Sequence, residues 1–570
     1  MSRPDPTVPS REGRLRAVSQ WSDRAGTGRR ELRVTASSAA RVQRVEILAE
    51  SGRRRTFAVI SHPDAGKSTL TEALALHAHV ISEAGAVHGK AGRRGVTSDW
   101  MEMERTRGIS ITSAALQFAY GDTVINLLDT PGHADFSEDT YRVLSAVDSA
   151  VMLLDAAKGL EPQTLKLFDV CRYRGIPVIT FINKWDRPGR EALELCDELT
   201  QRIGLQPMPL TWPVGVAGHL RGVLDVPSGD FIRYQHTAGG ATVAPEERLT
   251  PQQAVADLGD EWAQAVEEAE LLRASGGEFE VARFFDATAT PVLFGAAVRN
   301  FGVRHLLDLL VELAPRPTPR TDTDGATRAL DSPFSAFVFK VQTGMDPAHR
   351  DQVAFARVCS GVFERGMVVT NASTGKPFAT KYVQQVFGQQ RSTLDTAFPG
   401  DVIGLVNATA LRVGDTLYTG KPPVRFPGLP SFAPAHFAVA RPADLGRAKQ
   451  FRKGVEQLGA EGVVQVLRSD RRGDAAPVLA AVGPMQFEVA AHRMATEFTS
   501  PIRLEPLPYH AVRRLADPAQ RSIVDAGRRS EVLTRLDGAE LALFAEEMDL
   551  RILLRAHPGL VLESLVAEGG

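Results

Sequence analysis

The sequence predicts a multidomain α/β protein, in which an α/β domain with a phosphate-binding P-loop precedes an antiparallel β-barrel and an α+β domain. At 570 residues, the chain is long enough for three or four domains. Up to about residue 315, short apolar runs alternate with helical stretches, which is typical of parallel strands buried on both faces. Beyond a linker rich in Pro, Thr and Asp, the pattern changes to short strands with glycine turns, which favours an antiparallel barrel.

Changes in composition set the expected domain boundaries. We expect an N-terminal extension over 1–52, the α/β domain over 53–315, a linker over 316–332, the barrel over 333–425 and an α+β domain of the βαββαβ type over 426–570. The stretch of about 188–288 is too long for a loop, so it is predicted to be an inserted subdomain. The extension mixes arginines with Ser, Thr, Gly and acids, and we expect it to be disordered.

The composition narrows the class of protein. With 43% hydrophobic and 24% charged residues, the chain is ordinary for a soluble globular protein. No apolar run approaches the length of about 18 residues that a membrane span requires. The three cysteines are scattered and form no metal-ligand spacing, which favours a reducing compartment. We therefore expect a cytoplasmic protein without a membrane partner, and a net charge of −2 gives no sign of a nucleic-acid partner.

Five near-continuous apolar runs are predicted to form the parallel sheet. They are Thr56–Ile60, Val124–Leu128, Ala150–Leu154, Val178–Ile182 and Val292–Phe294. Each run ends in a polar or glycine-containing turn. Because ligands of open α/β sheets bind at the carboxyl ends of the strands, these turns are the candidate site.

The turn after the first strand has the pattern of a phosphate-binding loop. It consists of Ser61, His62, Pro63, Asp64, Ala65, Gly66, Lys67 and Ser68. Backbone N–H groups of such a loop face the phosphates, the lysine reaches the β- and γ-phosphates, and the serine hydroxyl can ligate Mg²⁺. The usual pattern has glycine where this chain has Ser61, so the loop alone also allows a chance Gly-Lys-Ser turn.

The turn after the second strand carries a candidate catalytic histidine. It consists of Asp129, Thr130, Pro131, Gly132 and His133. The aspartate can hold Mg²⁺ through water, the glycine N–H can contact a γ-phosphate, and the histidine is predicted to lie beside that phosphate. We expect Lys67 and His133 to be the catalytic residues.

Two further turns indicate that the nucleotide is GTP. The turn Asn183, Lys184, Trp185 and Asp186 ends the fourth strand. The Asp186 carboxylate can accept hydrogen bonds from N1–H and the exocyclic amine of guanine, a donor pair that adenine lacks. Asn183 is expected to support the phosphate loop, and Lys184 to lie along the base. Gly295, Ala296 and Ala297 follow the last strand and are expected to present backbone N–H groups to the guanine O6.

A switch segment is predicted at Arg107–Thr112, between the first helix and the second strand. A hydroxyl in this segment can complete the coordination of Mg²⁺ only while a γ-phosphate is present, which is how a GTPase orders and releases its switch. Ser110 is the better candidate for this ligand, and Thr112 is the alternative.

These motifs, taken together, resemble a known family. The residues that carry the resemblance are 61–67, 98–104 running into 107–112, 135–142, 211–215, 300–303 and 345–351. With His133 after Asp-Thr-Pro-Gly and with Arg-Gly-Ile at 107–109, the α/β domain resembles those of the translational GTPases. Within that group the chain is most similar to the bacterial peptide chain release factor 3 family, from about Arg53 to near the C-terminus.

The resemblance implies a function. It implies a monomeric GTPase that binds GTP or GDP with Mg²⁺, is stimulated by the ribosome and its RNA, and drives class-I peptide release factors off the ribosome after peptide release. One alternative is another translational GTPase, such as an elongation factor G-like or ribosome-protection factor, but those carry further domains after the βαββαβ unit. The other is a GTP-binding scaffold that does not hydrolyse GTP, which Lys67, Ser68, Asp129 and His133 argue against.

Overall fold

The computed structural model describes residues 36–79, 115–131, 133–235, 242–343, 352–387, 390–429, 432–473 and 475–565. The chain divides into two compact units, 1–46 and 47–570. The last part of the predicted extension is helical, because α1 spans Ala36–Gly52. Ile47 is buried, and the Ser51 hydroxyl donates to its carbonyl at 2.6 Å. Residues 1–35 lie outside the described ranges, and for them disorder stays a prediction.

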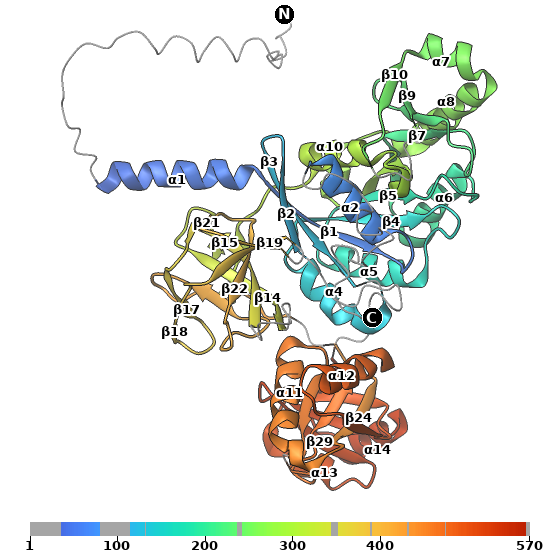
Figure 1. The fold of residues 1–570 in the computed structure, drawn as a ribbon. Helices are drawn as coiled ribbons and strands as arrows, with labels where there is room; N and C mark the ends of the chain where they lie inside the picture. The colour runs from blue at the N-terminus through green and yellow to red at the C-terminus, as the bar shows by residue number, and fades with distance from the viewer. Residues whose placement is uncertain are drawn as a thin grey trace, which may run out of the picture. The chain divides into compact units, whose positions relative to one another are not determined.

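A parallel sheet forms the centre of the α/β domain, as the apolar runs predict (Figure 1). Its order is β3-β1-β4-β5-β11-β6, and β2 adds an antiparallel edge beside β3. The strands are β1 (Arg54–Ser61), β2 (Ala115–Tyr120), β3 (Thr123–Asp129), β4 (Ser149–Asp155), β5 (Val178–Asn183), β6 (Gln206–Pro209) and β11 (Ala289–Phe294). The helices are α2 (Lys67–His77), α4 (Ser137–Leu144), α5 (Pro162–Tyr173), α6 (Ala192–Glu198) and α10 (Val303–Leu313).

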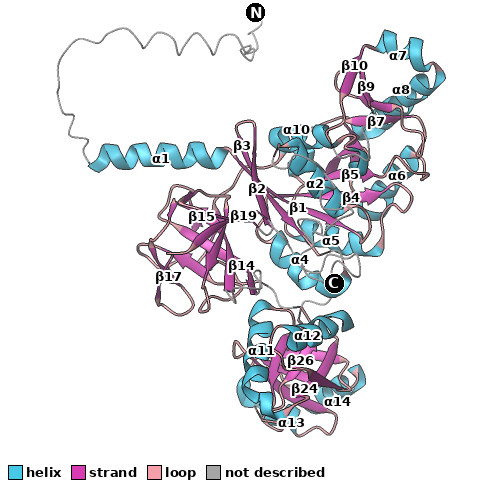
Figure 2. Ribbon diagram, in the orientation of Figure 1, coloured by secondary structure: helices cyan, strands magenta, loops and turns pink. Residues whose placement is uncertain are grey.

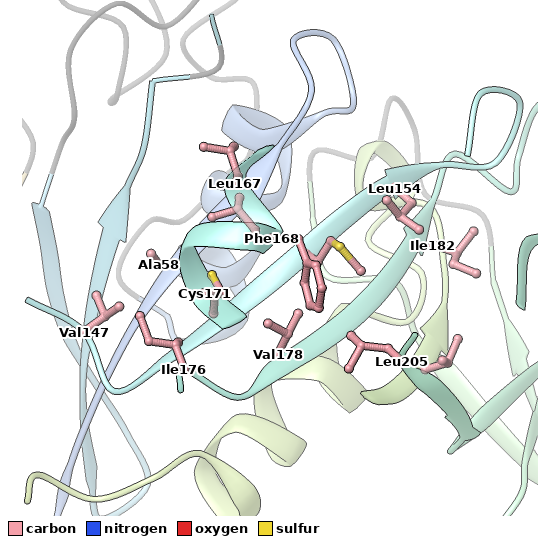
Figure 3. Close-up of a cluster of buried hydrophobic side chains, with 14 of the residues drawn as sticks. Ala58, Val147, Leu154, Leu167, Phe168, Cys171, Ile176, Val178, Ile182 and Leu205 are labelled. Atoms are coloured by element: carbon pink, nitrogen blue, oxygen red, sulfur yellow. The ribbon is translucent and has the colours of Figure 1, made fainter. Parts of the chain in front are cut away.

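Both faces of this sheet are buried. Along β1, Ala58 and Ile60 belong to one apolar cluster, whereas Phe57 and Val59 belong to another. Because successive side chains of a strand point to opposite faces, a strand covered on both sides must be apolar at every position. Figure 3 shows part of the first cluster, where α5 packs its apolar side onto the sheet.

The inserted segment folds around its own small sheet. Its strands are β7 (Thr211–Val214), β8 (Gly222–Asp225), β9 (Asp230–Tyr234) and β10 (Glu246–Leu249), in the antiparallel order β10-β9-β8-β7. The helices α7 (Pro251–Leu258), α8 (Asp260–Leu272) and α9 (Val281–Phe285) follow. Buried Trp212 and Trp262 join this segment to the core of the first cluster. The segment therefore continues the α/β core and supplies the strand β6 to the main sheet.

An antiparallel barrel follows, with an apolar interior of its own (Figure 2). Its strands are β14 (Ser335–Thr343), β15 (Gln352–Ser360), β16 (Phe363–Glu364), β17 (Val368–Asn371), β18 (Pro377–Ala379), β19 (Val383–Phe387), β20 (Gln390–Thr393), β21 (Thr396–Ala397), β22 (Val402–Val406) and β23 (Thr416–Tyr418). The short ribbon of β12 (Arg320–Thr321) and β13 (Thr327–Arg328) precedes it. One bridge, from Phe387 to Leu116, links β19 of the barrel to β2 of the α/β sheet.

The C-terminal domain contains two βαββαβ units, where the sequence predicts one. The first consists of β24 (His436–Pro442), α11 (Ala448–Glu461), β25 (Gln465–Arg468), β26 (Val478–Ala481), α12 (Pro484–Thr496) and β27 (Ile502–Pro506). The second consists of β28 (Ala511–Leu515), α13 (Arg521–Asp525), β29 (Ser530–Arg535), β30 (Glu540–Phe544), α14 (Glu547–Ala556) and β31 (Leu562–Glu563). The pairing of β25 with β29 joins the two units into one antiparallel sheet of eight strands. No helix in the described ranges has both the length and the apolar character needed to cross a membrane.

A buried carboxylate fastens the barrel to the edge of the α/β sheet. Asp401 accepts from the Arg54 guanidinium at 3.2 Å and from the Gln117 amide at 2.8 Å. The Phe398 backbone N–H also donates to it, at 2.9 Å. Burial raises the pKa of Asp401, and the Arg54 charge opposes that shift. Nearby, Thr56 donates to the Gly400 carbonyl at 2.7 Å. The strand after the predicted switch segment is therefore tied to the barrel.

Asp401→Asn is expected to lower the free energy of unfolding by about 1–3 kcal/mol, because Arg54 would then be buried beside a neutral amide. Chemical denaturation at neutral pH measures this change. Asp395→Asn is the matched control, since its ion pair with Arg365 is exposed and such pairs contribute about 0–1 kcal/mol. Equal losses in the two variants would contradict a stabilising role for Asp401.

The three cysteines are all buried. Burial raises the pKa of Cys171 to about 12, and it also raises the pKa of Cys196 and of Cys359. Because the thiolate is the reactive form, the native protein is expected to react with Ellman's reagent at pH 8 only very slowly, and the denatured chain with all three thiols. A fast-reacting native thiol would contradict this packing.

Candidate functional site

The phosphate loop connects β1 to α2 at the carboxyl edge of the sheet. Gly66 has φ +97°, and a Cβ at this position would lie 2.6 Å from the Asn183 amide nitrogen, so only glycine fits. Helix α2 begins at Lys67, and the first N–H groups of a helix have no partner within that helix. The loop can therefore present N–H donors to an anion. The neighbouring His62 ring lies 2.9 Å from the Glu161 carboxylate.

Lys67 joins the loop to the next motif. Its ammonium group lies 3.2 Å from the Asp129 carboxylate and also contacts the Thr130 carbonyl. The register of the sheet brings them together, because Val59 of β1 pairs with Asp129 at the end of β3. The Thr130 hydroxyl donates back to the Val59 carbonyl at 2.7 Å. A buried lysine, a buried carboxylate and the hydroxyl-bearing Ser68 after Lys67 are the groups that a magnesium-bound phosphate requires.

Asn183 connects three of the predicted motifs. Its amide N–H donates to the Ala65 carbonyl of the phosphate loop at 2.9 Å. Its amide oxygen accepts from the Ala297 backbone N–H at 2.8 Å. Both bonds are buried, so this one side chain fixes the loop and the turn after β11 relative to each other. The sequence predicts that Asn183 supports the loop, and the structure adds the second contact.

Lys184 has a partner that the sequence does not predict. Its ammonium group contacts the Asp64 carbonyl and lies 2.8 Å from the Asp155 carboxylate. Asp155 is the last residue of β4, and it therefore lies at the same edge of the sheet as the phosphate loop. Asp155 is a polar residue that ends a buried parallel strand, and this pattern alone could have identified it in the sequence as a candidate site residue.

Asp186 has the environment expected for a base-binding carboxylate. The preceding Trp185 is buried, its backbone N–H donates to the Gly295 carbonyl at 3.1 Å, and its ring packs edge-to-face on Phe294. Within the described ranges, the Asp186 Oδ1 atom is buried and has no hydrogen-bond partner. The Arg299 guanidinium lies 3.9 Å from the other oxygen. A buried acceptor of this kind fits the paired N–H donors of guanine, since leaving it without donors is costly.

His133 lies in the turn after β3, with its side chain 32% exposed. Its Nδ1 atom accepts from the Asp135 backbone N–H at 3.2 Å and lies 3.3 Å from the Asp135 carboxylate. Its ring makes an edge-to-face contact with Phe136. The predicted residues Gly132, Ser110 and Thr112 lie outside the described ranges, as do 98–104 and 345–351.

Three family models match successive parts of the chain. The family model of the elongation factor Tu GTP-binding domain matches residues 52–316, that of elongation factor G domain 2 matches 333–420, and that of the class II release factor RF3 C-terminal domain matches 426–554. The chain is also similar to a crystal structure of a protein from Thermus thermophilus, with a TM-score of 0.64. That likeness has 22% identity, covers 86% of this chain and 72% of the other, and concerns the fold.

Curated relatives cover most of the chain. The peptide chain release factor 3 of Gloeobacter violaceus is 49% identical over 82% of this chain and 88% of its own length. That of Symbiobacterium thermophilum is 45% identical over 90% of this chain and 97% of its own length. That of Synechococcus elongatus is 48% identical over 90% and 93%. This chain belongs to the peptide chain release factor 3 family.

Proposed function

We propose that this chain is the ribosome-stimulated GTPase of translation termination that promotes the departure of class-I release factors after peptide release. Membership of the family makes the chain a GTP-binding and GTP-hydrolysing protein of termination. We further propose that it acts in the cytoplasm as a monomer, with the ribosome and class-I release factors as partners. The observation that carries the proposal is that a nucleotide-site domain and the class II release factor C-terminal domain occur in one chain. The buried hydrogen bonds of Asn183, which join the phosphate loop to the turn after β11, support the nucleotide-binding part of it.

In the proposed site, one end binds the phosphates and the other end binds the base. At the phosphate end, the loop N–H groups and Lys67 neutralise charge that develops on the phosphates. Ser68, Asp129 and Ser110 are the proposed holders of Mg²⁺, which when bound supplies further positive charge to the β- and γ-phosphate oxygens. At the base end, Asp186 accepts from guanine, and the backbone of 295–297 faces its O6.

His133 is proposed to orient the attacking water. Its ring contacts two residues that follow it in the chain, Asp135 and Phe136. Because these contacts hold the ring within its own turn, we expect slow hydrolysis by the free protein. Docking on the ribosome is proposed to bring His133 to the γ-phosphate, and activation of this kind is worth about 10³–10⁵ in rate.

Two measurements test the proposal. Phosphate release from GTP is expected to rise steeply when ribosomes are added, and an unchanged rate would contradict the assignment to translation. On post-termination ribosomes carrying a fluorescent class-I release factor, this protein with GTP is expected to accelerate loss of the label. Active hydrolysis without that acceleration would favour an elongation factor G-like role instead.

A further inference from the structure

Asp135 links the candidate catalytic turn to the C-terminal domain. Its carboxylate accepts from the Met485 backbone N–H, at the start of α12, with a distance of 2.6 Å. The same residue holds His133, since its backbone N–H donates to Nδ1 and its carboxylate lies 3.3 Å from that atom. One side chain therefore stands between the histidine of one domain and a helix of another.

The N-terminus of α12 lacks a capping side chain at its N-cap position and can accept this carboxylate as its cap. Its N-cap residue, Gly483, has no side chain with which to cap the helix, and Pro484 at the first position has no N–H. Asp135 supplies the missing acceptor from the other domain and places a negative charge at the positive end of the helix. A Cβ at Gly483 would overlap the Asp135 carboxylate, so this glycine leaves room for the contact. Gln486 completes the cap from within, accepting from the Val482 N–H at 2.7 Å.

The C-terminus of a second helix, α11, receives a positive charge from the α/β domain. Arg142 of α4 lies 3.5 Å from the Glu461 carbonyl at the C-terminus of α11, where a cation is favourable. A Cβ at Gly462 would overlap the Arg142 guanidinium. Next to Arg142 in the chain, Tyr141 packs edge-to-face on Phe432 in a small apolar cluster. The C-terminal domain thus makes three contacts with the α/β domain, and all three involve the segment that follows His133.

We propose that Asp135 is a positioning residue whose shared carboxylate lets the C-terminal domain control the tautomer of His133. This inference rests on the proposed role of His133 in hydrolysis. With α12 in place, the Asp135 N–H donates to Nδ1, which requires a lone pair there and puts the proton of the neutral ring on Nε2. In that form Nε2 cannot accept a hydrogen bond from the attacking water.

Release of α12 has the reverse effect. The Asp135 carboxylate, no longer held by the Met485 N–H, closes on Nδ1 and accepts a hydrogen bond from its proton, as a carboxylate orients the imidazole of other catalytic histidines. The Nε2 atom then carries the lone pair and can accept from water. Docking of the C-terminal domain on the α/β domain therefore slows GTP hydrolysis, and departure of the C-terminal domain on the ribosome permits GTP hydrolysis.

Two substitutions test this inference in opposite directions. Gly483→Ala displaces the Asp135 carboxylate from α12 while every residue of the α/β domain stays the same. The ribosome-free kcat is expected to rise about tenfold, the effect of losing one hydrogen bond to a charged group. Asp135→Asn keeps an acceptor for α12 but loses the charge that favours the Nδ1–H form. Its ribosome-stimulated kcat is expected to fall about 10- to 100-fold, with an unchanged KM for GTP.

The controls separate this inference from the proposed function. Gly559→Ala is the matched control for Gly483→Ala, because a Cβ there meets no atom within 4 Å. The double variant Gly483→Ala/His133→Ala is expected to lose the tenfold gain, and a gain that survives without His133 would overturn the inference. An unchanged or lower ribosome-free rate in folded Gly483→Ala would overturn it too, as would full ribosome-stimulated activity of Asp135→Asn. Failure of ribosomes to stimulate the wild-type protein would instead contradict the proposed function.

Discussion

His133→Ala is expected to lower the ribosome-stimulated rate of GTP hydrolysis by about 10³-fold or more while GTP still binds. The reason is that a group which orients the attacking water acts only in the transition state, and without it the partner-dependent activation of a GTPase, about 10³–10⁵ in rate, is expected to be lost. Single-turnover phosphate release on ribosomes measures the rate. Equilibrium binding of a fluorescent GTP analogue measures the affinity.

The control for this experiment is His219→Ala, which removes an exposed histidine of the inserted segment. That variant is expected to keep the wild-type rate. If His133→Ala kept more than a tenth of the wild-type rate on ribosomes, the water-orienting role would be wrong. If both the rate and the GTP affinity fell, the side chain would instead contribute to the binding of the nucleotide.

The sheet and the order of its turns could be predicted because local pattern determines them. A strand buried on both faces must be apolar throughout, as the runs that became β1, β3, β4, β5 and β11 are. Parallel strands place their carboxyl ends at one edge, so the turns beginning at Ser61, Asp129 and Asn183 had to meet there. The contact of Asn183 with the phosphate loop is of this kind.

Contacts between domains could not be predicted in the same way. Asp401 lies far along the chain from its partner Arg54, and Asp135 is equally distant from Met485. No periodicity relates such pairs, and a glycine such as Gly483 has the same appearance in the sequence whether it serves a turn or leaves room for a carboxylate. The roles of these residues become visible only when the domains are folded and in contact.

The second βαββαβ unit was missed for a different reason. Its helix α13 spans only Arg521–Asp525 and its last strand only Leu562–Glu563. Segments of this length show less than two helical turns or a single alternation, which is too little for a hydrophobic period to be recognised. The pairing of β25 with β29 stabilises these short elements, because it extends one sheet through both units.

Asp186→Asn is expected to weaken GTP binding by about 10²–10⁴-fold and to create a preference for xanthosine triphosphate. The carboxylate offers two acceptors to the two N–H donors of guanine, and each hydrogen bond to a charged group contributes about 1.5–3 kcal/mol. An asparagine offers one acceptor and one donor, so its NH₂ group faces the guanine amine without a partner. Xanthine carries an oxygen at that position and accepts from the same NH₂ group.

Displacement of a bound fluorescent nucleotide by each of the two triphosphates measures this change of preference. Asp169→Asn, on the exposed side of α5, is the matched control and is expected to leave both affinities unchanged. Because the phosphate loop is untouched, ribosome-stimulated hydrolysis of xanthosine triphosphate by Asp186→Asn is expected to approach the wild-type rate with GTP. A variant that lost affinity for GTP without gaining affinity for xanthosine triphosphate would contradict this role. It would show that Asp186 supports the fold of its turn and does not bind the base through its two acceptor oxygens, one of which is the buried Oδ1 atom.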